Sequence, residues 1–191
     1  MKFQSFKNPI LILAIFMCAS GTALGEDQIV SLFHAGGTAI SEGDQVTITV
    51  QYTTSDTNNK LNTLGMRIHY DSSKLEYVGL KEAFLNGIMV KNPLPQNERE
   101  GDSDGDETTD KVIILSYYSI AGDWPDTALP LKLGNLVFKA KGDTTINVTK
   151  VSVNNGYGFQ ANGTGITLGS EISKTKGLKE VISILKELSN F

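Results

Sequence analysis

The sequence predicts an all-β protein, built as one antiparallel β-sandwich and followed by a C-terminal helix. Three observations predict this fold class. Short segments of alternating apolar and polar residues follow one another between residues 28 and 168, mostly separated by Gly, Asp or Asn. No helical periodicity precedes residue 171, and 191 residues that are 40% hydrophobic suffice for one buried core. Because each strand has one apolar face, we expect two sheets packed face to face.

Residues 1–25 are predicted to be a cleaved signal peptide. Lys2 and Lys7 give a positively charged start, residues 10–17 are almost wholly apolar, and residues 23–25 place small side chains where a signal peptidase cleaves. The segment therefore predicts an extracytoplasmic protein, either secreted or periplasmic.

Two alternatives for this segment stay open. An uncleaved anchor needs about 20 apolar residues, which the run at residues 9–19 does not supply. Lipid attachment at Cys18 needs small residues before the cysteine, but Phe16 and Met17 are bulky. Cys18 is the only cysteine, so cleavage leaves a mature chain without a disulfide.

The charge of the chain excludes two classes of partner. The formal net charge is −4, and loss of Lys2 and Lys7 with the signal peptide makes the mature chain more acidic. The sequence contains no cluster of Lys and Arg. We therefore expect no nucleic-acid partner and no membrane insertion after signal cleavage.

The predicted sandwich domain covers residues 26–170 and contains about nine strands. These strands are expected at residues 29–33, 45–52, 64–70, 75–80, 87–91, 111–119, 131–140, 144–153 and 165–168. The strongest strand signal is at residues 45–52, where apolar residues alternate strictly with Thr and Gln.

Residues 64–80 predict a strand, a tight turn and a second strand. The alternation places two sets of side chains on opposite faces of the first strand: Met66, Ile68 and Tyr70 on one face, and Arg67 and His69 on the other. Asp71, Ser72 and Ser73 then interrupt the pattern, and their short polar side chains favour a turn. The apolar pattern resumes at Leu75.

This stretch resembles a known family. Residues 66–80 read MRIHYDSSKLEYVGL, which is similar to the hydrophobic-x-hydrophobic-x-Tyr-Asp-Pro-x-x-Leu-Glu run of cohesin domains from cellulosome scaffold proteins. Residues 43–50 and 133–140 look like two further strands of that family. The resemblance covers residues 28–168. It implies a nine-stranded jelly-roll sandwich whose partner is an exported protein with a dockerin-like helix pair.

Three residues depart from the family pattern. Ser72 stands in place of the proline, which keeps the turn but loses the fixed φ. Cohesins of the first type carry an Asn and an Asp that hydrogen-bond the dockerin, and this chain has Thr63 and Gly65 at those positions. The resemblance therefore implies the fold more directly than it implies the conventional dockerin contacts.

An acidic stretch at residues 101–110 is a candidate calcium site. Carboxylates at alternate positions of a Gly-containing loop can converge on one Ca²⁺ ion, which takes six to eight oxygen ligands. The candidate ligands are Asp102, Asp104, Asp106 and Asp110. The spacing begins like an EF-hand loop, but Glu107 occupies the position of the turn glycine and Ile113 that of the bidentate acid. The alternative is a solvated acidic loop without a metal.

Three aromatic residues are candidate polysaccharide contacts. One of Tyr117 and Tyr118 is expected to face outward, because neighbours on a strand face opposite ways. An exposed platform of Tyr118, Trp124 and Tyr157 would stack on sugar rings. The alternative is that these rings fill the ends of the sandwich. His69 lacks a paired histidine or a cysteine in the sequence, so we expect a surface or loop residue and not a metal ligand.

The C-terminal residues 171–191 are predicted to form an amphipathic helix. Its apolar side chains follow the spacing of one helical face: Leu178, Val181, Ile182, Leu185 and Leu188. The helix is expected to cover an open sheet edge. Residues 177–186 are also similar to a helix of a dockerin repeat, but residues 171–176 lack the calcium ligands of such a repeat.

The sequence predicts a binding module without catalytic activity. It contains no serine nucleophile elbow, no phosphate-binding glycine loop and no cysteine after residue 25. The expected function is recognition of a protein partner in a polysaccharide-related extracellular assembly. A carbohydrate-binding module and a structural component of a surface or adhesin assembly remain as alternatives.

Overall fold

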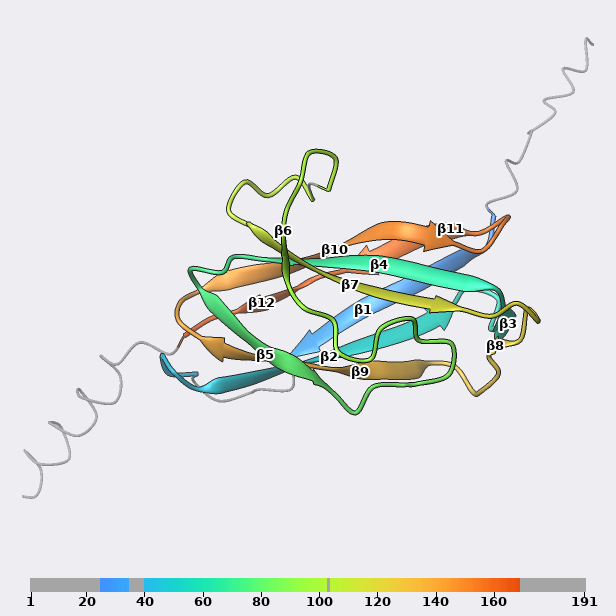
Figure 1. Ribbon diagram of the computed structural model, residues 1–191, viewed down its shortest axis with the longest axis horizontal. Helices are drawn as coiled ribbons and strands as arrows, with labels where there is room; N and C mark the ends of the chain where they lie inside the picture. The colour runs from blue at the N-terminus through green and yellow to red at the C-terminus, as the bar shows by residue number, and fades with distance from the viewer. Residues whose placement is uncertain (1–24, 35–39, 103, 169–191) are drawn as a thin grey trace, which may run out of the picture.

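The computed structural model describes residues 25–34, 40–102 and 104–168, and every regular element in these ranges is a β-strand (Figure 1). The first sheet has the order β11-β1-β2-β9-β5, with β1 Asp27–His34, β2 Gln45–Thr54, β5 Leu75–Lys81, β9 Leu131–Ala140 and β11 Gly158–Asn162. The second sheet has the order β12-β10-β4-β7-β6, with β4 Thr63–Tyr70, β6 Gln96–Asn97, β7 Lys111–Tyr118, β10 Thr144–Val153 and β12 Thr164–Ile166. A short pair, β3 Lys60–Leu61 and β8 Trp124–Pro125, completes the fold.

The two sheets pack into a sandwich, which confirms the predicted fold class. In β2 every second residue from Val46 to Tyr52 is buried, as the strict alternation predicts. In β4 the side chains of Met66, Ile68 and Tyr70 enter the same core from the opposite sheet. The alternation of β4 therefore leaves Arg67 and His69 on the outer face of the second sheet.

One predicted strand is absent, and several observed strands were not predicted. Residues 87–91 form no strand, and the structure has only an isolated bridge between Ile88 and Tyr117. The reason is local, because Gly87 has a φ of 71° and Ile88 closes a turn onto the Leu85 carbonyl. The sequence also gave no indication of β11, which pairs with β1 in the parallel direction. The first sheet is therefore mixed and not wholly antiparallel.

The turn after β4 has the predicted chemistry. The Asp71 carboxylate accepts the Ser73 N–H at 2.7 Å, and the Asp71 carbonyl accepts the Leu75 N–H at 2.9 Å. Ser72 donates both its N–H and its hydroxyl to the Asp110 carboxylate, each at 2.7 Å. The turn is thus joined to the residue that precedes β7.

Aromatic side chains fill the end of the sandwich near β3 and β8. The Trp124 ring is fully buried and stacks on Tyr117 with ring centroids 5.0 Å apart. Tyr52 approaches the same indole at 5.0 Å, and the indole N–H donates to the Asn86 carbonyl at 2.8 Å. This arrangement matches the interpretation of these rings as core.

Two segments of the predicted organisation lie outside the described residues. They are the signal peptide at residues 1–25, except for its last residue, and the helix at residues 171–191. Both stay predictions, as does the domain boundary at residues 26–170. Among the residues that the structure describes, no helix has the length and apolar character needed to cross a membrane.

Candidate functional site

The outer face of the second sheet carries the main candidate site. Strand β4 lies between β7 and β10, and its outward positions are Thr63, Gly65, Arg67 and His69. Gly65 pairs with Ser116 of β7 and Arg67 pairs with Ile114 of the same strand. This face therefore contains the two positions at which the sequence departs from the dockerin contacts of its family.

Exposed apolar side chains gather at the β7 side of this face. Residues 87–90 run along the edge of β7, and the Met89 N–H donates to the Ser116 carbonyl at 2.9 Å. The exposed fractions are 64% for Met89, 54% for Val90, 77% for Leu94 and 50% for Tyr118. We call these four residues the apolar patch. Met89, Val90 and Leu94 line a pocket of about 270 Å³ whose floor includes Ile114.

Gly65 allows close contact between β4 and β10. The register of β10 shifts between Lys150 and Ser152, so Val151 forms a bulge opposite Gly65. A Cβ atom at residue 65 would lie 2.5 Å from the Ser152 hydroxyl oxygen and 3.1 Å from the Val151 Cβ. The Thr63 hydroxyl lies 3.3 Å from that same hydroxyl oxygen. Thr63 and Gly65, which stand where the family has its dockerin contacts, are therefore packed against β10 in this chain.

The acidic loop, described at residues 98–102 and 104–110, covers the other part of the same face. The Asp102 carboxylate lies 2.9 Å from Arg67 Nε, and the Asp104 carboxylate accepts the Asn147 amide at 2.8 Å. The Glu98 carboxylate lies 2.6 Å from His69 Nδ1. These contacts attach the loop to outward positions of β4 and β10.

The four predicted calcium ligands do not gather around one point: Asp104 and Asp106 are hydrogen-bonded to each other, whereas Asp102 and Asp110 contact other residues. Asp102 pairs with Arg67, as above, whereas Asp106 accepts the Thr108 N–H at 2.9 Å and Asp110 accepts Ser72. Among the described residues, the group whose ligand atoms lie within 4.8 Å of one another is His69, Glu98 and Asp104. Only Asp104 belongs to both sets. The calcium site at the four aspartates stays a prediction.

Hydrogen bonds stabilise the charged form of two of these carboxylates. Burial opposes ionisation of Asp110, but the N–H and hydroxyl of Ser72 and the charge of Lys111 outweigh it and lower the carboxyl pKa. The hydroxyl and N–H of Thr108 lower the pKa of Asp106. Both side chains are therefore ionised well into the acid range.

His69 corrects a sequence-based expectation. We expected a surface or loop residue, but His69 lies within β4 and its side chain is fully buried. Its Nε2 lies 2.7 Å from the Thr149 hydroxyl oxygen, opposite the contact of Nδ1 with Glu98. The alternation of β4 correctly indicates that His69 faces outward, but it gives no sign that the acidic loop covers that face.

The three candidate carbohydrate residues do not form one exposed platform. Tyr118 is half exposed, which confirms that one of the two adjacent tyrosines faces outward and the other, Tyr117, faces the core. Trp124 is buried between core aromatic rings and has no exposed face for a sugar. The Tyr157 hydroxyl donates to Asp56 at 2.6 Å and accepts the Asn58 amide.

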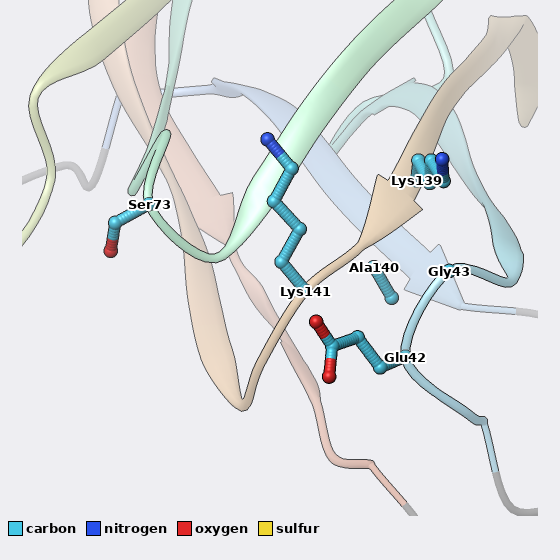
Figure 2. Close-up of a pocket in the computed structure, with 6 residues that line it drawn as sticks. All are labelled: Glu42, Gly43, Ser73, Lys139, Ala140 and Lys141. Carbon is cyan, nitrogen blue, oxygen red and sulfur yellow. The ribbon is translucent and has the colours of Figure 1, made fainter.

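A second pocket lies at the end of the sandwich away from β3 and β8. Its charged side chains do not point toward a common ligand position. Glu42, Ser73, Lys139 and Lys141 are among its lining residues. Figure 2 shows the Lys141 amine turned away from the Glu42 carboxylate. That amine lies 3.2 Å from Glu76 instead. The charged groups of this pocket therefore do not converge on a ligand position.

The fold and the family comparison agree. The family model described as the cohesin domain matches residues 35–175, which is more than half of the chain. The chain belongs to the cohesin domain family. Its class is accordingly that of non-catalytic protein-binding modules. No curated protein matches the chain at a significant level.

Solved structures of cohesins resemble the chain at low sequence identity. The sixth cohesin of scaffoldin B from Acetivibrio cellulolyticus, solved with a Cel5 dockerin mutant, is 14% identical, with a TM-score of 0.49 and coverage of 76% of this chain and 99% of that one. CaCohA2 from Clostridium acetobutylicum is 16% identical, with a TM-score of 0.48 and coverage of 76% and 94%. The seventh ScaB type I cohesin from Pseudobacteroides cellulosolvens is 13% identical, with a TM-score of 0.45 and coverage of 75% and 92%.

Proposed function

We propose that this chain binds an exported protein partner through the outer face of its second sheet. The observation that supports this proposal best is the apolar patch of Met89, Val90, Leu94 and Tyr118, which lies beside the outward positions of β4. Large apolar side chains grouped on one surface are typical of interaction sites, whereas scattered ones are not. The partner class that the family implies is a dockerin-like protein.

The contacts that we propose differ from those of conventional dockerin binding. Thr63 and Gly65 offer no carboxylate or amide to a partner, and both are packed against β10. The patch offers aliphatic side chains, which contribute buried apolar area, and Tyr118, a residue type that typically anchors a partner. We therefore propose that the partner presents an apolar helix face, with hydrogen bonds contributing less than in the conventional complexes.

We further propose that binding takes place outside the cytoplasm, in a polysaccharide-related assembly. The signal peptide predicted at residues 1–25 supports export. Direct binding to polysaccharide has less support, because Trp124 is buried and the Tyr157 hydroxyl is held by Asp56. Tyr118 is the remaining exposed ring of that candidate set.

Two parallel binding assays test the proposal. The mature chain is immobilised and exposed to the secreted proteins of its own organism, and separately mixed with a panel of insoluble polysaccharides. We expect capture of a specific protein that the double variant Met89→Glu, Leu94→Glu no longer captures. The control Phe33→Glu changes an equally apolar side chain, 49% exposed on the first sheet, and should capture normally. Retention on a glycan with no protein captured would contradict the proposal.

A further inference from the structure

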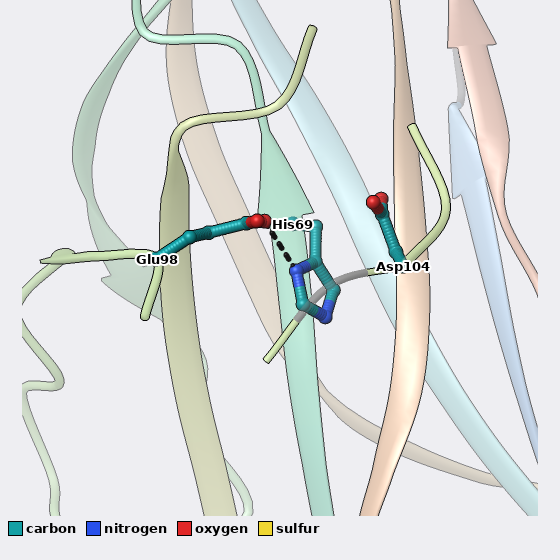
Figure 3. Close-up of side chains that lie close together, drawn as sticks. All are labelled: His69, Glu98 and Asp104. Atoms are coloured by element: carbon teal, nitrogen blue, oxygen red, sulfur yellow. Dashed lines mark hydrogen bonds and ion pairs between the residues drawn. The ribbon is translucent and has the colours of Figure 1, made fainter. Parts of the chain in front are cut away.

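We infer that His69, Glu98 and Asp104 form a binding site for a divalent cation of the zinc class. One atom from each residue lies within 4.8 Å of the other two. Figure 3 shows the Glu98 carboxylate reaching His69 and Asp104 lying on the other side of the ring. The inference does not depend on the partner proposed above, because none of its three residues belongs to the apolar patch.

The spacing of the three atoms requires only small movements for coordination. With metal–ligand bonds of about 2.0–2.2 Å, ligand atoms around a tetrahedral ion lie roughly 3.3–3.6 Å apart. The His69 Nδ1 and Glu98 oxygen, now 2.6 Å apart, would separate by roughly 1 Å as the ion replaces the proton between them. Glu98 and Asp104 belong to the acidic loop, outside the sheet ladder, so their side chains can make this adjustment.

Hydrogen bonds already orient two of the three ligands. His69 is fully buried in β4, and the Thr149 hydroxyl lies 2.7 Å from its Nε2. A metal-bound histidine characteristically has such a partner on its second ring nitrogen, which fixes the ring and the tautomer. Asp104 is oriented by the Asn147 amide at 2.8 Å and the Thr109 hydroxyl at 3.1 Å. These outer contacts come from β10 and from the end of the acidic loop.

The surroundings of the two carboxylates also favour a cation. The Glu98 side chain is only 17% exposed and lies close to a second carboxylate, Asp104. Among the described residues, neither carboxylate has an ion pair with a lysine or arginine, and nearby Arg67 pairs with Asp102. Two partly buried carboxylates beside one imidazole, without a lysine or arginine partner, form an anionic set of donors that suits a divalent cation.

The donor set selects the class of ion. One imidazole nitrogen and two carboxylate oxygens suit Zn²⁺, which binds three protein ligands and leaves a fourth position to water. Ca²⁺ binds six to eight oxygen ligands, so a site with an imidazole nitrogen suits it less well. The bound ion would join β4 to two parts of the acidic loop and hold the loop on the outer face of the second sheet.

Titration of the tag-free mature chain with Zn²⁺ tests this site. We expect one Zn²⁺ ion to bind per chain, to raise the melting temperature, and to lose that effect when a chelator is added. In NMR spectra the ring signals of His69 should shift while those of His34 should not. Co²⁺ should give the visible absorption of a four-coordinate site.

Two matched variants separate coordination from folding. Glu98→Gln removes the anionic ligand but keeps an oxygen that accepts a hydrogen bond from His69, so the loop should stay in place without metal. Loss of a residue that only orients a ligand typically weakens metal binding by roughly 10–100-fold. Because Glu98 is itself a proposed ligand, we expect Glu98→Gln to weaken Zn²⁺ binding by at least that factor. Glu100→Gln removes the same charge from an exposed side chain outside the cluster and should bind Zn²⁺ normally.

Three results would overturn the inference. They are the absence of heat and of any melting shift with Zn²⁺, equal weakening by both variants, and a response to Ca²⁺ where Zn²⁺ gives none. The last result would favour the calcium site predicted at Asp102, Asp104, Asp106 and Asp110.

Discussion

Ser72 shows how one departure from a family pattern is compensated by its surroundings. Proline has no N–H, so the family residue could not make the bond from the Ser72 N–H to Asp110. The serine makes that bond and adds a second from its hydroxyl. The sequence predicted the turn from the residue types, but it could not identify Asp110 as the partner, because the two residues are 38 positions apart.

Removing one of these hydrogen bonds should destabilise the domain, and removing both should destabilise it further. Ser72→Ala removes the hydroxyl bond, and we expect it to lower the free energy of unfolding by about 0.5–1.5 kcal/mol. Ser72→Pro removes both bonds and should lower it further, while Ser73→Ala is the matched control. Urea unfolding measures the three variants. A Ser72→Pro variant as stable as the wild type would contradict the role of Asp110.

The same carboxylate predicts a pH dependence. Because the pKa of Asp110 is lowered in the folded state, its contribution to stability is complete above the unfolded value of about 3.9 and is lost as pH falls through the folded pKa. We therefore expect a melting temperature that varies little with this group above about pH 5 and falls below about pH 4. Asp110→Asn should reduce the acid-dependent part of that fall.

Tyr77, which is partly buried, and Tyr52, which is fully buried, should respond oppositely to loss of the hydroxyl. Among the described residues, the Tyr77 hydroxyl is buried without a hydrogen-bond partner, and burial raises its pKa to about 12. Tyr77→Phe should therefore stabilise the protein by about 1 kcal/mol while keeping the ring contact with Phe138. The Tyr52 hydroxyl accepts the Gln28 amide at 2.9 Å, so Tyr52→Phe should destabilise it by a similar amount. Thermal unfolding showing the same sign for both would contradict this account.

At the scale of elements, alternation predicted the long strands and missed those that depend on a partner. Strands β2 and β4 have apolar alternation and β7 and β9 have short apolar runs, and these strands and β10 lie close to the predicted bounds. Strand β11 has exposed and half-buried residues, and it forms because β1 offers a parallel edge. Periodicity detects burial of one face but not the edge at which a polar segment pairs.

Gly65 gives the sharpest prediction at this scale. Replacing glycine within a strand normally stabilises it, since glycine has the largest conformational entropy to lose. Here the β10 bulge occupies the space of a side chain, so Gly65→Ala should instead destabilise by about 1–3 kcal/mol. Adding Ser152→Ala removes the closest atom and should recover part of the loss. If Gly65→Ala alone stabilised the protein, the prediction would be wrong, because the β10 bulge would then move away from the new methyl group at little energetic cost.

At the scale of the whole molecule, the sequence predicted the class of protein but not the composition of its binding face. The runs at residues 43–50, 66–80 and 133–140 together indicated the cohesin fold, which the family match to residues 35–175 supports. The apolar patch combines Met89, Val90 and Leu94 with Tyr118, and the cluster of possible metal ligands combines His69 with two residues of the acidic loop. The residues of each set are distant in the sequence. They become neighbours only in the folded chain, where β4, β7 and the loops between them lie together.

The central claim is that a protein partner binds the outer face of the second sheet. Its most direct test is the affinity of the captured partner for three purified chains, measured by calorimetry: the wild type, Leu94→Glu and Phe33→Glu. We predict that Leu94→Glu weakens binding by about tenfold or more, because it places a charge in an apolar contact, and that Phe33→Glu binds like the wild type. Unchanged affinity for Leu94→Glu together with weakened binding by Phe33→Glu would place the partner on the first sheet and contradict the claim.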